Sequence, residues 1–206
     1  MNDLGNLPVT RSAWLELKSE RELMQEGYEF LDEKRMIIAT ELQRQLRAYR
    51  DECAQLETRR RESAAALGLA AARHGFDGLT VYPAAGLRRW SQARHTSRFL
   101  GVELFSAGEV EVDQVPSTQP APASHEAEHC RDCYAALVEL AGRVALRVSN
   151  LRRLIAEYVR TERRARALEN VLLPDVERKL EFLDDQLEAI DREESLRVRF
   201  ADSSRG

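Results

Sequence analysis

The sequence predicts a mainly α-helical protein: a long antiparallel two-helix coiled coil formed by N- and C-terminal helices, with a small middle region that contains a β-hairpin. Two observations predict this fold. Apolar residues recur at spacings of three and four over two long stretches of the 206-residue chain, one towards each end. A helix that long buries its apolar stripe only against a partner along its length. Paired in opposite directions, the two helices would form a rod roughly 90–110 Å long at ~1.5 Å per residue.

Composition agrees with this fold and excludes several functions. Charged residues make up 32% and aromatic residues 6% of the chain, which is typical of coiled coils. The net charge of −4 argues against a general nucleic-acid binder. We expect no membrane insertion, because no apolar run of about 18 residues occurs, and the first residues do not resemble a signal peptide. Three cysteines are too few for a disulfide framework, and they favour a cytoplasmic location.

The N-terminal helix is expected over residues 10–73. Thr10 has the side chain of an N-cap residue. Two rows of apolar residues at heptad spacing predict a narrow seam: Leu17, Met24, Leu31 and Ile38 in one row, and Tyr28, Leu42, Tyr49 and Leu56 in the other. Gly27 interrupts these rows, either to let a partner helix approach or as a tolerated surface glycine. Gly75 is expected to end the helix with a left-handed backbone.

The middle region, residues 74–124, carries the clearest β signal. Residues 100–115 predict a hairpin, because two β-prone runs flank Ser106-Ala107-Gly108, a connection that suits a hairpin turn. Before it, residues 79–82 favour a short strand and residues 86–98 a short helix. After it, residues 116–124 are a proline-rich linker.

The C-terminal helix is expected over residues 125–200. Its first apolar row recurs every seven residues: Val144, Leu151, Tyr158, Ala165 and Leu172. Beyond Pro174 a neighbouring row takes over, with Val176, Leu183 and Ile190. This shift between rows is a stutter, which predicts a local change of winding. Pro174 lacks an N–H and crowds the carbonyl of Asn170, so we expect it to bend the helix.

Several phrases of the chain resemble the D subunit of the V-type and A-type rotary ATPases. The longest is Thr161-Glu-Arg-Arg-Ala-Arg-Ala-Leu-Glu-Asn-Val-Leu-Leu-Pro-Asp-Val-Glu177 in the last helix. Near the N-terminus, Val9-Thr-Arg-Ser-Ala-Trp-Leu-Glu-Leu-Lys18 and Gly27-Tyr-Glu-Phe-Leu-Asp-Glu-Lys-Arg35 are similar to the opening segments of that family. Gly101-Val102 falls where the family has a turn into a strand. The motifs occur in the family's order along both long helices.

The resemblance implies a central stalk that rotates inside a ring of catalytic A and B subunits and drives ion transport through a membrane ring. A small protein, the F subunit, would bind its side, and another subunit would link it to the membrane rotor. The complex would be cytoplasmic and peripheral to the membrane, running towards ATP synthesis or hydrolysis. The stalk itself would be no enzyme and would need no cofactor. The sequence agrees, because it has no glycine-rich phosphate loop.

Charged residues on the two helices, together with Pro174, are the candidates for partner contact. Arginines gather before Pro174 and acidic residues after it, so alternating patches would meet different ring subunits. The nine candidates combine residues of the family phrases with this pattern: Arg11, Lys18, Lys34, Arg35, Arg163, Arg164, Arg166, Glu169 and Pro174.

Two other functions stay open at this point. The chain is alternatively a free-standing coiled-coil adaptor or scaffold that docks through its hairpin. It is otherwise a metal- or redox-sensing helical hairpin, since His125, His129, Cys130 and Cys133 are zinc-ligand types. One continuous helix spreads these four side chains over too wide an arc for a tetrahedral ion, so we expect no metal site. A disulfide between the two cysteines would be strained on a helix.

Overall fold

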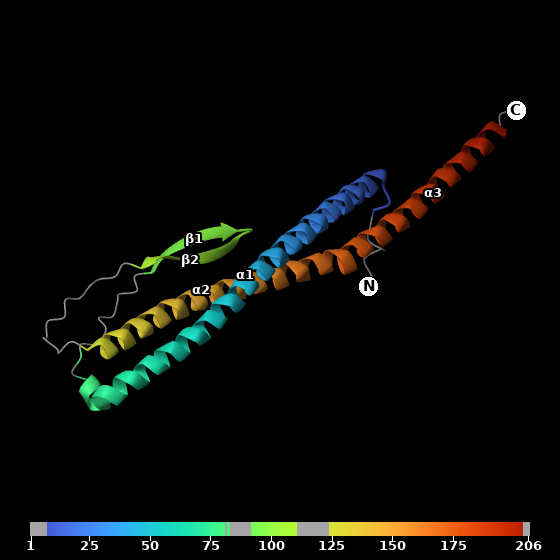
Figure 1. Ribbon diagram of the computed structural model, residues 1–206. Helices are drawn as coiled ribbons and strands as arrows, with labels where there is room; N and C mark the ends of the chain where they lie inside the picture. Colours follow the sequence, from blue (N-terminus) through green and yellow to red (C-terminus); the bar gives the residue numbers. More distant parts are fainter. Residues whose placement is uncertain (1–7, 81, 83–91, 111–123, 204–206) are drawn as a thin grey trace. The chain divides into compact units, whose positions relative to one another are not determined.

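The computed structural model describes residues 8–80, 82, 92–110 and 124–203 (Figure 1). The elements follow one another as α1 (Arg11–Leu79), β1 (Gln92–Phe99), β2 (Val102–Val110), α2 (His125–Ala167), the π-helical turn η2 (Leu168–Leu172) and α3 (Leu173–Ser203). The protein is therefore mainly α-helical, with long helices towards both ends and one antiparallel hairpin between them, as the sequence predicts.

The contacts divide the chain into two compact units. We call Met1–Ile37 with Tyr158–Gly206 the terminal unit, and Ile38–Glu157 the central unit. In the terminal unit, Arg11 on α1 binds Asp191 on α3, whereas Gly27 lies beside Leu168 of η2. Residue numbers therefore increase along α1 in the direction in which they decrease along the partner helix, so this helix pair is antiparallel.

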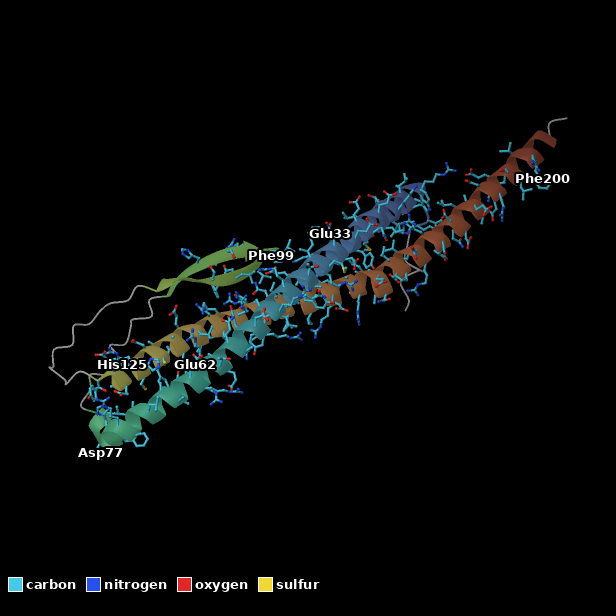
Figure 2. All side chains as sticks on the ribbon, viewed as in Figure 1. Glu33, Glu62, Asp77, Phe99, His125 and Phe200 are labelled. Atoms are coloured by element: carbon cyan, nitrogen blue, oxygen red, sulfur yellow. The ribbon has the colours of Figure 1, made fainter. Side chains whose placement is uncertain are left out.

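The central unit contains a second stretch of antiparallel pairing. Near its start, Arg147 on α2 hydrogen-bonds Glu52 on α1. At the other end, Arg73 pairs with Glu126, close to where α1 ends and α2 begins. Figure 2 labels Asp77 and His125 at these two neighbouring helix ends.

The seam predicted for α1 is the less exposed side of the helix. Thr10 caps α1, because its Oγ1 accepts the Ala13 N–H at 3.2 Å. All the seam positions of the two heptad rows are half-buried except Ile38, which is fully buried. Small residues take over in the central unit, where Ser63, Ala66 and Ala70 are buried. The Ser63 hydroxyl donates to the Arg59 carbonyl, so its burial leaves that group paired.

Gly75 breaks α1, as expected, with a φ of 68°. Helical residues nevertheless resume after it and continue to Leu79. The short strand expected over residues 79–82 is wrong, because the Thr80 N–H donates to Asp77 O and the Tyr82 N–H to Leu79 O. These bonds close turns directly after the helix and leave no extended run for a strand.

The hairpin exists, but its turn lies earlier than predicted. Phe99 pairs with Val102, so Leu100 and Gly101 form a two-residue connection. Both have positive φ, 48° and 86°, which suits the twist of a tight hairpin. The predicted turn, residues 106–108, lies inside β2, and part of the predicted helix 86–98 is β1. Residues 86–91, 111–115 and most of the linker lie outside the described residues.

The hairpin packs on α2 through β2 (Figure 1). Val102 and Leu104 of β2 are buried. Asn150, buried on α2, accepts the Phe105 N–H at 2.9 Å and donates to the Phe105 carbonyl at 2.7 Å. The side chain of Arg153 donates to Glu103 O at 3.2 Å and lies over the Phe105 ring. An isolated two-stranded hairpin is marginal in water, so these contacts hold it on the helix.

The predicted change of winding before Pro174 is a π-helical turn. The Leu173 N–H bonds the Leu168 carbonyl, five residues back. One extra residue is thereby accommodated. The buried residues Leu154 and Thr161 lead by heptad spacing to positions 175 and 182, and the residues that are buried, Val176 and Leu183, lie one position later. Val176 and Leu183 are buried, as predicted, whereas Leu172 is 42% exposed. Leu172 was therefore wrongly predicted as a seam residue.

Ile190 was also predicted in the seam and is 43% exposed. It lies next to Asp191, the residue that meets Arg11 at the first residue of α1. The partner helix therefore has no further turn to cover this part of α3.

Candidate partner-binding surface

All nine predicted contact residues lie in the terminal unit. They come from the first part of α1, the end of α2, η2 and the start of α3. Sequence positions more than 120 residues apart are thus collected on one antiparallel helix pair.

Arg11 and Lys18 both have partners within the terminal unit. Arg11 forms an exposed ion pair with Asp191 at 3.0 Å. Lys18 lies 5.2 Å from the centre of the Trp14 ring, a cation–π contact. Both basic residues therefore contact side chains of the terminal unit in the isolated chain.

A polar groove lies beside Lys18. It is lined by Trp14, Lys18 and Arg21 of α1, and by Glu177, Leu180, Glu181 and Asp184 of α3. The Trp14 Nε1–H is buried and has no hydrogen-bond partner among the described residues. Acidic and basic side chains of the two helices therefore line the same groove.

The arginines of the family phrase are exposed on α2. Arg166 is held by Glu162, one turn earlier, at 2.6 Å. Arg163 and Arg164 form no ion pair with a described residue, and both point to solvent. Thr161, which precedes the three arginines, and Ala165, which lies between Arg164 and Arg166, are buried. The buried face therefore orients the three guanidinium groups outward from the helix pair.

Lys34, Arg35 and Glu169 are more constrained. Arg35 pairs with Asp32 on its own helix at 2.5 Å, and Lys34 is half-buried. Glu169 lies near Tyr28 across the helix pair, and its negative charge raises the pKa of the Tyr28 hydroxyl. Glu169 thus contacts α1, which gives it a structural role besides any partner contact.

Pro174 lies just after the π turn and is half-buried. Its carbonyl accepts Arg178 Nε at 3.2 Å, while Asp175 binds Lys179 at 2.9 Å. The Lys179 hydrogen bond is the main cause that lowers the pKa of the Asp175 carboxyl. Val171, on the π turn itself, is 61% exposed, and its neighbour Leu172 is exposed too. This apolar pair was missed from the sequence, because a helical pattern without the extra residue assigns Leu172 to the seam.

The His/Cys cluster lies at the start of α2 in the central unit. His125 and His129 stack with ring centres 6.2 Å apart, and His129 Nε2 lies 3.7 Å from Cys133 Sγ. Cys130 and Cys133 are free thiols, and burial raises the pKa of Cys130. Over the described ranges, no group of three or more His, Cys, Asp or Glu side chains is arranged to hold a metal ion.

These features define a class of protein: antiparallel helical hairpins with a small β-hairpin inserted between the helices. The model of the family described as the ATP synthase D subunit matches residues 13–203. The chain belongs to the ATP synthase D-subunit family.

Curated relatives agree over nearly the whole chain. A V-type ATP synthase D subunit of Thermotoga neapolitana is 26% identical over 194 residues, covering 92% of this chain and 94% of the relative. Proteins with the same description from Anaeromyxobacter sp. and Anaeromyxobacter dehalogenans are 29% and 28% identical. They cover 93% and 95% of this chain, and 91% and 95% of their own lengths. No helix in the described part of the chain is long and apolar enough to cross a membrane.

Proposed function

We propose that the chain is the non-catalytic central rotor shaft of a V-type or A-type rotary ATPase. It transmits torque between ATP turnover in a hexamer of A and B subunits and ion transport in a membrane ring. The match to the ATP synthase D-subunit family over residues 13–203 carries this proposal. The antiparallel helix pairing in each unit supports it, because side-by-side helices resist twisting better than a single helix does.

The terminal unit is the part that enters the catalytic hexamer. Its buried seam fixes which side chains point outward, so the exposed arginines Arg163, Arg164 and Arg166 keep one direction on the helix surface. A rotating shaft needs such an asymmetric surface, because each orientation must favour a different nucleotide state of the ring. Charged patches that meet different ring subunits in turn supply this preference.

The central unit carries the remaining partners. A small stalk protein, the F subunit, binds beside it, and a further subunit links the shaft to the membrane rotor. The chain is then cytoplasmic and reaches the membrane only through its complex. Its sequence has no glycine-rich phosphate loop, and the ATP is bound and hydrolysed by the ring.

Reconstitution with the ring subunits tests this function. We expect one copy of the chain per A/B hexamer, together with the F subunit. Arg163→Gln, Arg164→Gln and Arg166→Gln combined should weaken binding to the hexamer and leave the melting temperature of the isolated chain almost unchanged. The matched control replaces three exposed arginines of the central unit: Arg59, Arg60 and Arg61. A chain that does not bind the hexamer, or that brings unrelated partners as an adaptor would, contradicts the proposal.

Pro174 is proposed to shape the shaft. The residue follows a π turn, and such turns locally change the winding of a helix. We expect Pro174→Ala to lower the number of ions moved per ATP hydrolysed in the assembled complex. Unchanged assembly, turnover and ion coupling would remove Pro174 from the mechanism.

A further inference from the structure

The two edges of the β-hairpin differ in a way that the proposed function does not use. The bonds from Asn150 to Phe105 show that the N–H and C=O of Phe105 point away from β1. Phe105 pairs with Thr96. In an antiparallel ladder both members of a pair either bond each other or both point outward. The backbone N–H and C=O of Thr96 therefore point away from β2.

The register extends this pattern along the strand. Arg98 pairs with Glu103, whose carbonyl also points outward and accepts Arg153. Outward groups on β1 thus belong to Thr96 and Arg98, whereas Ser97 and Phe99 bond to β2. Figure 2 labels Phe99 at the turn end of the hairpin.

Side chains of α2 occupy the outer edge of β2, whereas no described strand lies along the outer edge of β1. Asn150 satisfies Phe105, and Arg153 satisfies Glu103. The sheet has two strands, and within the described residues no backbone group pairs with the outward face of Thr96 or Arg98. An open strand edge is a template for another strand.

The charge of β1 indicates which kind of strand would bind at its outer edge. β1 contains two arginines and no acidic residue. The Arg98 side chain is 81% exposed, and its contact with Glu103 is long, at 3.7 Å. An added strand lies directly beside Thr96 and Arg98, where opposite charges across strands are favourable. A carboxylate on that strand would meet the arginine.

We propose that the outer edge of β1 binds an extended, acidic segment of a neighbouring subunit in the rotary complex by strand addition. This proposal rests on the proposed function, since it needs the assembled complex. The backbone of Thr96 and Arg98 supplies hydrogen bonds, and Arg98 supplies the charge contact. Asn150 supports the site by holding β2 on α2, so that the partner meets a hairpin of fixed orientation.

Residue-resolved hydrogen exchange of the full chain tests the proposal, free and within the reconstituted complex. In the free chain, the amides of Thr96 and Arg98 should exchange quickly, whereas those of Ser97 and Phe99 should be protected. In the complex, Thr96 and Arg98 should slow by about tenfold or more, because they gain a strand partner. Fast exchange of both amides in a complex that has assembled overturns the strand addition alone. Failure to assemble contradicts the proposed function instead.

Thr96→Pro is the sharpest variant. Proline removes the outward N–H of residue 96 and no bond of the β1–β2 ladder, a substitution that edge strands tolerate. The free variant should keep Ser97 and Phe99 protected, while Arg98 loses its extra protection in the complex. Thr96→Val is the matched control, since it keeps the N–H and nearly the same shape. Equal Arg98 protection in both variants overturns the proposal.

Two further experiments identify the segment that binds the outer edge of β1. Arg98→Gln should reduce the protection gained in the complex by about tenfold, and more strongly at low salt. No change overturns the acidic character of the partner strand. Protection of Thr96 in the free chain that vanishes on dilution shows pairing between two copies. Protection that persists on dilution shows that a segment of the same chain covers the edge. Either result contradicts binding of a neighbouring subunit.

Discussion

The guanidinium group of Arg147 on α2 binds two residues of α1 that lie seven positions apart. Its Nε and Nη2 donate to the carboxylate of Glu52 at 2.7 and 2.5 Å, and its Nη1 donates to Gln45 Oε1 at 2.9 Å. Gln45 in turn donates to Glu41. A polar network within an apolar seam fixes the register of two helices, because a shifted pairing would leave its charges without partners.

Arg147→Met should therefore destabilise the central unit. The pair is largely buried, with exposed fractions of 25% and 17% for the two side chains. Removing the arginine leaves Glu52 with an unpaired charge, and we expect a loss of about 2–3 kcal/mol in the free energy of unfolding. Urea denaturation measures it. Arg60→Met removes an exposed intrahelical pair with Glu57, which water screens, and should change the free energy of unfolding far less. Equal losses would contradict the register role of Arg147.

Asn150→Ala should release the hairpin from α2. The variant loses both bonds to Phe105, a net cost of about 1–3 kcal/mol. Because an isolated hairpin is marginal, the loss should appear as faster amide exchange throughout β1 and β2, with α2 little changed. The neighbouring Ser149→Ala serves as control. Unchanged exchange in the hairpin of the Asn150 variant would show that apolar burial alone holds it.

A deletion tests whether the π turn accommodates one extra residue. Removing Val171, which is exposed, in a Pro174→Ala background should let an α-helix continue with Val176 and Leu183 still buried. Removing Arg163 in the same background should instead rotate the residues between the deletion and the π turn, including the buried Ala165, out of the seam. We expect the second variant to be less stable by about 1–3 kcal/mol, because a residue of the exposed face then occupies a core position. Similar melting temperatures for the two deletions would rule out this explanation of the π turn.

Replacing Gly27 distinguishes the two interpretations of this glycine, which are close approach of a partner helix and a tolerated surface glycine. A Cβ built there would lie 3.9 Å from Leu168 Cδ1, an ordinary van der Waals distance. Gly27→Ala should thus stabilise the chain by about 0.5–1 kcal/mol, through helix propensity. Gly101→Ala should destabilise the hairpin, because Gly101 has a φ of 86°. Thermal unfolding measures both, and a loss of stability in Gly27→Ala would show that close helix approach is required.

Glu57 gives a pH dependence with a defined sign. Hydrogen bonds from Arg60 and then Arg61 lower the pKa of its carboxyl from 4.5 to about 2. Since the folded-state pKa is lowered, the stabilisation is present above pH 4.5 and is lost as the pH falls towards 2. An NMR titration should give a midpoint near 2, which returns towards 4.5 in Arg60→Gln/Arg61→Gln. A midpoint that both proteins share would contradict the two hydrogen bonds.

The heptad rows predicted the helices and their seam because burial of an apolar stripe is a local, periodic signal. The hairpin turn was not predictable in the same way. Leucine rarely adopts a positive φ, so nothing in the sequence indicates that Leu100 starts a tight turn. The buried residues Ser63, Ala66 and Ala70 were hidden because small residues leave a weak amphipathic pattern.

Long-range polar contacts were also out of reach of the sequence. Arg147 appeared only as one of many arginines, and Asn150 as an ordinary helical residue. Their roles depend on residues 45 to 102 positions away, which only the fold brings together. The nine surface candidates were identified by family phrases and charge. The structure adds which of them already have partners, as Arg11 and Arg166 do, and which point outward free of ion pairs with described residues, as Arg163 and Arg164 do.

Single-molecule rotation tests the central claim most directly. The A/B hexamer, assembled with this chain and the F subunit, is fixed to a surface. A bead is attached to one cysteine introduced in the central unit, after the native Cys53, Cys130 and Cys133 are replaced by serine. With ATP present, the bead should turn in one direction, in discrete steps that stop when ATP is removed. A bead that stays still, or only fluctuates, while the same complexes hydrolyse ATP would contradict a rotor shaft.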